Sequence, residues 1–283
     1  MNVSEVVKTP QLVLDKNGIW QASYAEKMSY PEEGNNYCFA VEDNSFWFKH
    51  RNDVIFELTK RFRFVKNFAD VGGGNGFQVK FLSEKYPQKQ IFLIEPGYAG
   101  CLNAKKRGVN DAYNVFFQDF PFEEKQIDAV GLFDVIEHIE DDKAFLTDLV
   151  KYLPSKAHIY ITVPAHQWLW SEVDDESGHF RRHNLASLEK LAKDCGLEYA
   201  FGSYIFSYLP PLMGILRAIP YRLARLFQKT RKNTLDAEFD NHTPSKLAIT
   251  IFNLLHNWEL KRLRKNRIPF GASCAVVFKT KND

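Results

Sequence analysis

Cysteine is scarce in this chain of 283 residues, which contains only 4 of them. They lie far apart and include no pair at metal-binding spacing, so the sequence predicts neither a disulfide framework nor a zinc site. These residues are Cys38, Cys101, Cys195 and Cys274. Because isolated thiols are typical of a reducing compartment, we expect a cytoplasmic protein.

Long apolar runs are absent as well. No stretch reaches the roughly 18 residues that are needed to span a bilayer. Residues 1–10 also lack the apolar core of a signal peptide. We therefore expect neither a membrane-spanning helix nor a secretory leader. Hydrophobic residues make up 45% of the chain and charged residues 25%, which are ordinary values for a globular protein of this length.

Acidic residues are missing from one long segment, because none occurs between Glu198 and Asp236. Residues 199–283 carry 14 Lys and Arg against 5 Asp and Glu, a net charge of +9. Subtraction from the chain totals of 37 and 35 leaves 23 basic and 30 acidic residues in residues 1–198, a net charge of −7. The basic C-terminal part therefore favours contact with an anionic partner or a membrane surface.

The most informative stretch that is present is FADVGGGNGF, residues 68–77. An apolar run that ends in an acid, followed by clustered glycines, predicts a strand, a tight loop and a helix. The glycines let the backbone approach a ligand with no side chain in the way. Asp70, at the carboxyl end of the strand, is placed to accept hydrogen bonds from a cationic group. An ordinary tight turn is the alternative interpretation of this loop.

Two later stretches repeat the pattern of an acid after an apolar run. IFLIEPG, residues 91–97, ends its run in Glu95, and QDFP, residues 118–121, places Asp119 after another apolar segment. The ends of three successive predicted strands therefore carry Asp70, Glu95 and Asp119. A carboxylate only accepts hydrogen bonds, so it suits a vicinal diol, an exocyclic amine or an ammonium group.

These motifs, in this order, resemble the class I S-adenosylmethionine (SAM)-dependent methyltransferases over residues 65–197. The resemblance implies that Asp70 and its loop hold the methionine end of SAM, that Glu95 binds the ribose hydroxyls and that Asp119 faces the adenine amino group. The other cofactor contacts that we expect are Trp47, Arg51, Gly72, Gly74, Pro96, Gln118, Phe120, Phe133, Asp134 and His138. A dinucleotide-binding dehydrogenase also has a glycine loop, but its fingerprint requires glycine or alanine where this chain has Phe77.

The alternation of strand and helix patterns predicts an α/β fold with a Rossmann-like, seven-stranded, mostly parallel sheet. Strands are expected at residues 66–71, 90–95, 112–116, 127–133, 159–163, 197–204 and 273–279. We divide the chain into an N-terminal arm and cap helix (1–62), a SAM-binding core (63–206), a basic helical insert (207–270) and the last strand of the core (271–283).

The N-terminal part shows little periodicity over residues 1–36, which we interpret as an arm with short turns. A helix is expected across residues 41–62, with Asn44 or Ser45 as its N-cap. Helices in this place often cover the cofactor in the resembling family, so Trp47 and Arg51 are candidates for SAM contacts. Arg51 suits a forked pairing with the methionine carboxylate. The alternative is an amphipathic helix that packs on the sheet edge.

The insert separates two strands that form a hairpin with a short turn in the resembling fold. Apolar and basic residues alternate at helical spacing around Pro220, and a second amphipathic helix is expected near residues 247–262. One interpretation is a helical subdomain that packs its apolar stripe on the core. The other is an interfacial helix pair that meets lipid peripherally through residues 210–267.

The stretch GLFDVIEHIEDD, residues 131–142, closes the fourth predicted strand. The end of this strand faces the methyl sulfonium in the resembling fold, which implies that Phe133 and Asp134 line the methionine portion. We expect His138 to contact the cofactor rather than to act as a base.

The richest polar stretch is VPAHQWLWSEVDDESGHFRRH, residues 163–183, after the fifth predicted strand. This strand end borders the acceptor side of the site in the resembling fold. A similar pattern occurs in bacterial SAM methyltransferases near surface-glycan genes. Asp174 matches the acid of that pattern, and His183 stands where those relatives often show tyrosine. The expected catalytic residues are His166, His179 and Asp174, and the expected acceptor contacts are Trp168, Trp170, Arg181 and Arg182.

Each of these residues also has a structural interpretation. The histidines suit satisfied structural positions, and the arginines suit loop struts bonded to Glu172 or Asp175. The tryptophans suit either a lid over an acceptor ring or simple packing. Because His166, Asp174 and His179 are irregularly spaced, we predict no metal site.

The sequence therefore predicts an enzyme that transfers a methyl group from SAM to an oxygen, less readily a nitrogen, of a small-molecule or glycan- or lipid-linked acceptor. A nucleic-acid methyltransferase is the second hypothesis. It is disfavoured because the fourth strand lacks an NPPY-like loop for a flipped base. A non-catalytic protein that keeps this fold is the third.

Overall fold

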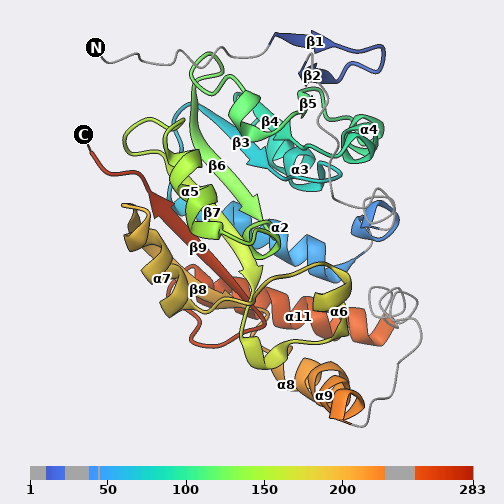
Figure 1. Ribbon diagram of the computed structural model, residues 1–283. Coiled ribbons are helices and arrows are strands. Elements are labelled where there is room, and N and C mark those ends of the chain that lie inside the picture. Colours follow the sequence, from blue (N-terminus) through green and yellow to red (C-terminus); the bar gives the residue numbers. More distant parts are fainter. Residues whose placement is uncertain (1–10, 23–37, 44, 227–245, 283) are drawn as a thin grey trace.

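The computed structural model describes residues 11–22, 38–43, 45–226 and 246–282, and its ribbon is drawn in Figure 1. These residues form one mixed sheet of nine strands in the order β1-β2-β5-β4-β3-β6-β7-β9-β8. The strands are β1 (Leu12–Leu14), β2 (Trp20–Ala22), β3 (Asn67–Val71), β4 (Ile91–Ile94), β5 (Ala112–Asn114), β6 (Ile127–Phe133), β7 (His158–Pro164), β8 (Glu198–Ile205) and β9 (Ser273–Lys279). The fold is Rossmann-like, as the sequence predicts.

The middle of the sheet is parallel from β5 through β7, and β9 runs antiparallel to both β7 and β8. These central strands are buried on both faces, which is why their sequences are nearly continuous apolar runs rather than alternating ones. Strands β6 and β9 coincide with their predicted ranges. Because parallel strands share a direction, the carboxyl ends of β3, β4, β6 and β7 meet at one edge.

The described sheet has two more strands than the seven predicted, because the N-terminal arm forms a hairpin. Strands β1 and β2 pair antiparallel, and β2 extends the sheet beside β5 in parallel. The turn is stabilised by Asp15, whose carboxylate accepts hydrogen bonds from the Asn17 and Ile19 amides at 2.8 and 2.9 Å. Gly18 supplies the left-handed conformation with a φ of 73°. Three-residue strands carry too little periodicity to be recognised in a sequence.

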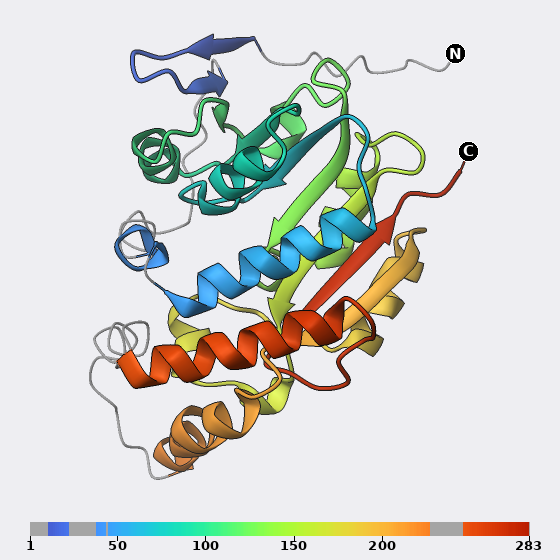
Figure 2. The same ribbon diagram turned by 180° about the vertical axis from the view of Figure 1, so that it is seen from behind.

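Helices cover both faces of the sheet. One face carries α2 (Phe46–Arg61), α3 (Phe77–Lys85) and α11 (Lys246–Leu263), and the other carries α5 (Asp142–Val150) and α7 (Leu185–Asp194). Figure 2 shows α2 and α11 lying side by side across the sheet. Further helices are α4 (Tyr98–Lys106), α6 (Glu172–Glu176), α8 (Pro210–Met213) and α9 (Ile219–Leu226), with the short turns η1 (Phe117–Asp119), η2 (Ile136–His138), η3 (Gln167–Leu169) and η4 (Gly214–Ala218).

Helix starts follow the capping chemistry of the sequence. The hydroxyl of Ser45 accepts a hydrogen bond from the Trp47 amide and caps α2, whereas the alternative cap Asn44 lies outside the described residues. Asp141 caps α5 and Asn184 caps α7 in the same way.

The first part of the insert is helical from Pro210 to Leu226, despite Pro220. The turn η4 has π-helical geometry immediately before α9. A π-turn is one way to absorb the hydrogen bond that proline cannot donate, so Pro220 does not break the helix here. No described helix is long and apolar enough to cross a bilayer.

Candidate functional site

The glycine loop after β3 is held to the end of β4 by Glu95. The amide of Gly74 donates to Glu95 Oε2 at 2.9 Å, and the amide of Gly97 donates to Oε1 at 2.7 Å. Gly72 and Gly74 have φ values of 72° and 52°, which favour glycine. The two strand ends are therefore tied into one cradle.

Glu95 keeps binding capacity after these two bonds, because a carboxylate has about four acceptor positions. Its side chain is buried, and this burial raises its pKa to about 7, although the Gly97 and Gly74 amides lower it. A ligand with two neighbouring hydroxyls satisfies the remaining lone pairs.

Asp70 is fully buried beneath the loop, and neither carboxylate oxygen has a hydrogen-bond partner among the described residues. A side chain at Gly73 would place its Cβ 2.6 Å from Asp70 Oδ2, so only glycine lets the loop lie this close. Burial raises the pKa of Asp70 to about 7, against the lowering effect of the Arg51 charge. The unpaired carboxylate favours a ligand that brings positive charge to this loop.

Arg51 reaches from α2 to the end of β6, where its guanidinium forms an ion pair with Asp134. The second carboxylate oxygen of Asp134 accepts from the hydroxyl of Thr162 at 3.1 Å. The Gln78 amide, with its oxygen turned to the guanidinium, accepts from Arg51 Nε at 3.3 Å. Asp134 has a φ of 57°, an uncommon conformation for aspartate. The structure thus brings together two predicted cofactor contacts, while Trp47 stacks on Phe206 at 3.8 Å between ring centroids.

The remaining predicted cofactor contacts lie along the same edge or beneath it. Phe133 packs inside the core against Phe68, and Phe120 packs against Tyr113 and Phe92. Gln118 donates to the half-buried carboxylate of Asp148 at 2.9 Å. Asp119, in η1, and Pro96 are half-buried.

Asp174 is the centre of the polar loop after β7. Its carboxylate is fully buried and accepts from Arg182 through Nε at 2.7 Å and Nη2 at 2.9 Å. The Ser171 amide donates to it at 2.8 Å, and Nδ1 of His179 lies 2.9 Å from its Oδ1. Burial alone would raise the pKa of Asp174, but these hydrogen bonds, first those of His179 and Arg182, lower it to about 2. Arg182 therefore braces the loop, through Asp174 rather than through Glu172 or Asp175.

His166 and Trp168 lie away from Asp174, against the insert. The His166 ring stacks on Tyr204 at 4.8 Å, and its Nε2 is buried with no partner among the described residues. Burial, and then the charge of Arg182, lowers the pKa of His166. Trp168 stacks on Phe270, and its carbonyl accepts from Arg222 at 2.8 Å. Both residues therefore join the core to the insert.

Trp170 lines an open groove of about 840 Å³ between the loop after β7 and α9. Its indole donates to Asp175 at 2.9 Å. The groove is lined by Gln167, Trp170, Asp175, Tyr221, Arg222, Arg225 and Leu226. Arg181, in contrast, pairs with Asp142 at 2.7 Å and donates to the Glu140 carbonyl.

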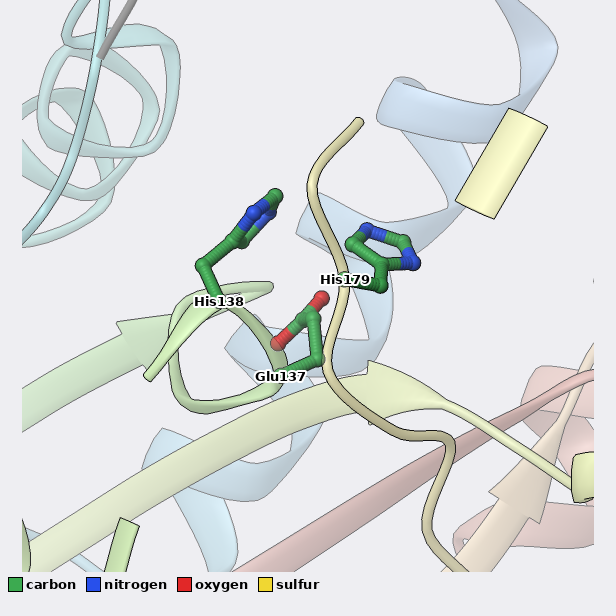
Figure 3. Close-up of side chains that lie close together, drawn as sticks. All are labelled: Glu137, His138 and His179. Atoms are coloured by element: carbon green, nitrogen blue, oxygen red, sulfur yellow. The ribbon is translucent and has the colours of Figure 1, made fainter. Parts of the chain in front are cut away.

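The structure also gathers three residues that sequence reasoning did not combine. Ligand atoms of Glu137, His138 and His179 all lie within 4.8 Å of one another, and Figure 3 shows the Glu137 carboxylate below the two neighbouring rings. The Phe180 amide donates to the Glu137 carbonyl at 2.8 Å, which draws the two segments together. The adjacent Glu and His in the DVIEH stretch were the available signal, but His179 is brought to them only by the fold.

These features fit the groups of SAM. The unpaired Asp70 oxygens, the glycine cradle over them and the spare acceptor positions of Glu95 match a cationic amino-acid end and a ribose diol. When bound, SAM would supply an electrophilic methyl group.

Solved structures show a similar fold. The chain matches phosphoethanolamine N-methyltransferase 2 of Haemonchus contortus, in complex with S-adenosyl-L-methionine, with a TM-score of 0.54 and 18% identity over 90% of this chain. The match covers 59% of that protein, so this chain spans less than two thirds of its length. The plantazolicin methyltransferase BpumL, in complex with S-adenosylhomocysteine (SAH), matches with a TM-score of 0.55, 12% identity, and 90% and 92% coverage of the two chains.

A third structure is a Haloferax volcanii putative methyltransferase in complex with the Trm112 methyltransferase activator. It matches with a TM-score of 0.54 and 14% identity, over 89% of this chain and 96% of the other. A family model described as a methyltransferase domain matches residues 47–200, which is more than half of the chain. The chain therefore belongs to this family of methyltransferase domains.

Proposed function

We propose that this enzyme transfers the methyl group of SAM to an oxygen of a small-molecule or glycan- or lipid-linked acceptor. The observation that carries the proposal is the His179–Asp174 pair, which lies beside the end of β6 where Asp134 is placed. An oxygen nucleophile must lose a proton, and an imidazole oriented by a carboxylate can accept it.

His179 suits this role better than His166. The ring of His179 is held through Nδ1 by Asp174 and lies beside Glu137 and His138. His166 is sandwiched between Tyr204 and Phe270. We assign His179 to the acceptor and His166 to the support of the loop.

Cofactor binding is assigned to the cradle at the ends of β3 and β4. Asp70 compensates the positive charge of the methionine end, and Glu95 binds the ribose hydroxyls. Arg51 holds Asp134 in place beside the methyl group, and Asp119 serves the adenine edge.

The groove between the loop after β7 and α9 supports an anionic acceptor. Arg222 and Arg225 line it beside Trp170, which offers a flat apolar surface to a sugar or aromatic ring. Arg181 and Arg182 are already engaged with acids and are assigned to positioning the loop.

A membrane surface suits the insert. Apolar side chains of the segment from Pro210 to Leu226 are exposed, including Ile215 at 65% and Leu226 at 76%. Basic residues Arg217, Arg222 and Arg225 accompany them. This combination is typical of a helix that lies on an anionic lipid surface, where a lipid-linked acceptor would be found.

Vesicle sedimentation tests this contact. Vesicles with phosphatidylglycerol should retain the protein, whereas phosphatidylcholine vesicles should not. Ile215→Asp should abolish retention, and Val65→Asp, at an even more exposed apolar position before β3, should not. Equal retention of both variants would refute the lipid contact.

A nitrogen acceptor is the second candidate, because one structural neighbour is named an N-methyltransferase. Labelled SAM incubated with the enzyme and fractionated cell extract distinguishes the two. Label released as methanol or recovered in an O-methyl sugar supports oxygen, and label recovered in a methylated amine supports nitrogen. Asp70→Ala and Glu95→Ala should each lose SAH affinity by calorimetry. Wild-type affinity in both variants would refute the assigned cofactor site.

A further inference from the structure

The cluster of Glu137, His138 and His179 contains a buried acid without a partner. Glu137 is fully buried, and neither of its carboxylate oxygens has a hydrogen-bond partner among the described residues. Two nearby arginines form ion pairs with other acids. Arg51 pairs with Asp134, and Arg182 pairs with Asp174. Burying a carboxylate without a partner costs free energy, so a cation bound beside Glu137 would stabilise the folded protein.

Each imidazole of the cluster is held in its orientation by a hydrogen bond at one ring nitrogen. Nδ1 of His179 lies 2.9 Å from the Asp174 carboxylate, and the His138 ring has a backbone hydrogen bond at Ser177. A ring nitrogen that donates to an acceptor leaves the other nitrogen with a lone pair. Histidines that bind metals are held in this manner, by a carboxylate or a carbonyl on the far nitrogen.

We propose that Glu137, His138 and His179 bind one divalent transition-metal ion. Two imidazoles and one carboxylate are a donor set that suits zinc, manganese, iron or cobalt better than calcium. Three protein ligands also leave open coordination positions for a substrate oxygen. This proposal replaces the expectation of no metal, which rested on the spacing of other residues.

The geometry of the cluster is close to that of a bound site. Two ligand atoms that each lie about 2.1 Å from an ion can be at most about 4.2 Å apart. The ligand atoms here lie within 4.8 Å of one another, so small side-chain rotations bring them into range. Glu137 and His138 belong to the short turn η2, three and four residues after Asp134, respectively.

The role of the ion rests on the proposed function. An acceptor hydroxyl that reaches an open position of the ion would lose its proton more easily, because a bound cation lowers the pKa of an oxygen ligand. The ion would then promote loss of the proton that the His179 imidazole would accept in the absence of a metal. Metal binding itself does not depend on which acceptor is used.

Cobalt binding tests the site on the full chain without an affinity tag. The protein is stripped with a chelator and titrated with Co²⁺, with visible absorption and calorimetry as readouts. We expect one ion per chain with ligand-field bands. Glu137→Gln and His179→Ala should each weaken binding at least about tenfold. His158→Ala, a half-buried histidine at the opposite end of β7, is the matched control and should bind cobalt like the wild type.

Affinity for SAH, measured on the same samples, separates the two proposals. Retained SAH binding with lost cobalt binding in the variants supports the metal site. If Glu137→Gln does not fold, His138→Ala and His179→Ala decide the question. No cobalt binding by the wild type, or equal binding by all variants, overturns the metal site and leaves the proposed methyl transfer intact. Cobalt binding by a wild type that does not bind SAH overturns the proposed function instead.

Discussion

The side chains of His50 and Glu259 meet at 2.8 Å although 209 residues separate them in the chain. Both are fully buried between α2 and α11. Glu259 also accepts from the amides of Phe206 and Ser207, each at 2.7 Å. Burial would raise the pKa of Glu259, but the bonds from His50 and Ser207 lower it. This carboxylate joins the cap helix, the end of β8 and the last helix.

Glu259→Ala should therefore destabilise the protein by about 3–5 kcal/mol, because it leaves a buried histidine and two amides unpaired. Urea unfolding followed by circular dichroism measures this change. Glu189→Gln, on the exposed side of α7, is the control and should cost less than about 0.5 kcal/mol. Equal midpoints for the two variants would contradict the linking role of Glu259.

Cofactor affinity should depend on pH. Burial raises the pKa values of Asp70 and Glu95 to about 7, so both carboxylates gain their charge as the pH rises through neutrality. SAM carries a positive sulfonium and should bind the charged form more tightly. Between pH 8 and pH 6 the charged fraction of each group falls roughly tenfold, and we expect SAM affinity to fall by at least that factor. Calorimetry at both values checks this.

Asp70→Asn is the matched variant for this pH dependence. It removes one of the two titrating carboxylates, so its SAM affinity should be weaker at pH 8 and should vary less between pH 6 and pH 8. A pH profile identical to that of the wild type would show that ionisation of Asp70 does not affect SAM affinity.

The loop after β7 should depend on the forked contact between Arg182 and Asp174. Arg182→Lys keeps the charge but loses one of the two parallel hydrogen bonds, and we expect a loss of about 1–3 kcal/mol in unfolding free energy. Arg181→Lys is the control, since its pair with Asp142 is partly exposed and should contribute less than about 1 kcal/mol.

The same pair has a pH signature in the acid range. The pKa of Asp174 is lowered to about 2, below its ordinary value of 3.8, so its contribution to stability is complete above pH 4 and is lost as the pH falls toward 2. Arg182→Lys should reduce this acid-range loss. An unchanged difference in stability between pH 5 and pH 2 would contradict the assignment.

Gly100 should matter for cofactor binding more than for stability. A Cβ at this position would lie 2.8 Å from the Gly74 carbonyl and 3.0 Å from Glu95 Cγ, so alanine would push the cradle open. Gly100→Ala should weaken SAH binding about tenfold or more by calorimetry, because the loop amides no longer hold Glu95. Gly196→Ala, at a left-handed position in open space, should cost about 1 kcal/mol of stability and leave SAH affinity unchanged.

The local sequence was sufficient to predict those parts of the protein whose structure depends on residues adjacent in the chain. Strand β6 and strand β9 could be predicted to the residue, because apolar runs bounded by turns decide where a buried strand begins and ends. The glycine loop and the acids Asp70 and Glu95 could be recognised for the same reason, since a tight loop at a strand end requires residues adjacent in the chain.

Only the tertiary structure decided which distant side chains share an environment. The edge hairpin β1–β2 exists because β5 offers it a partner, and the pairing of His50 with Glu259 requires α11 to lie on α2. Glu137 and His179 become neighbours only when the loop after β7 folds back on β6. Arg182, a candidate for substrate binding in the sequence, is instead buried against Asp174, because a buried carboxylate needs a partner that no local pattern reveals.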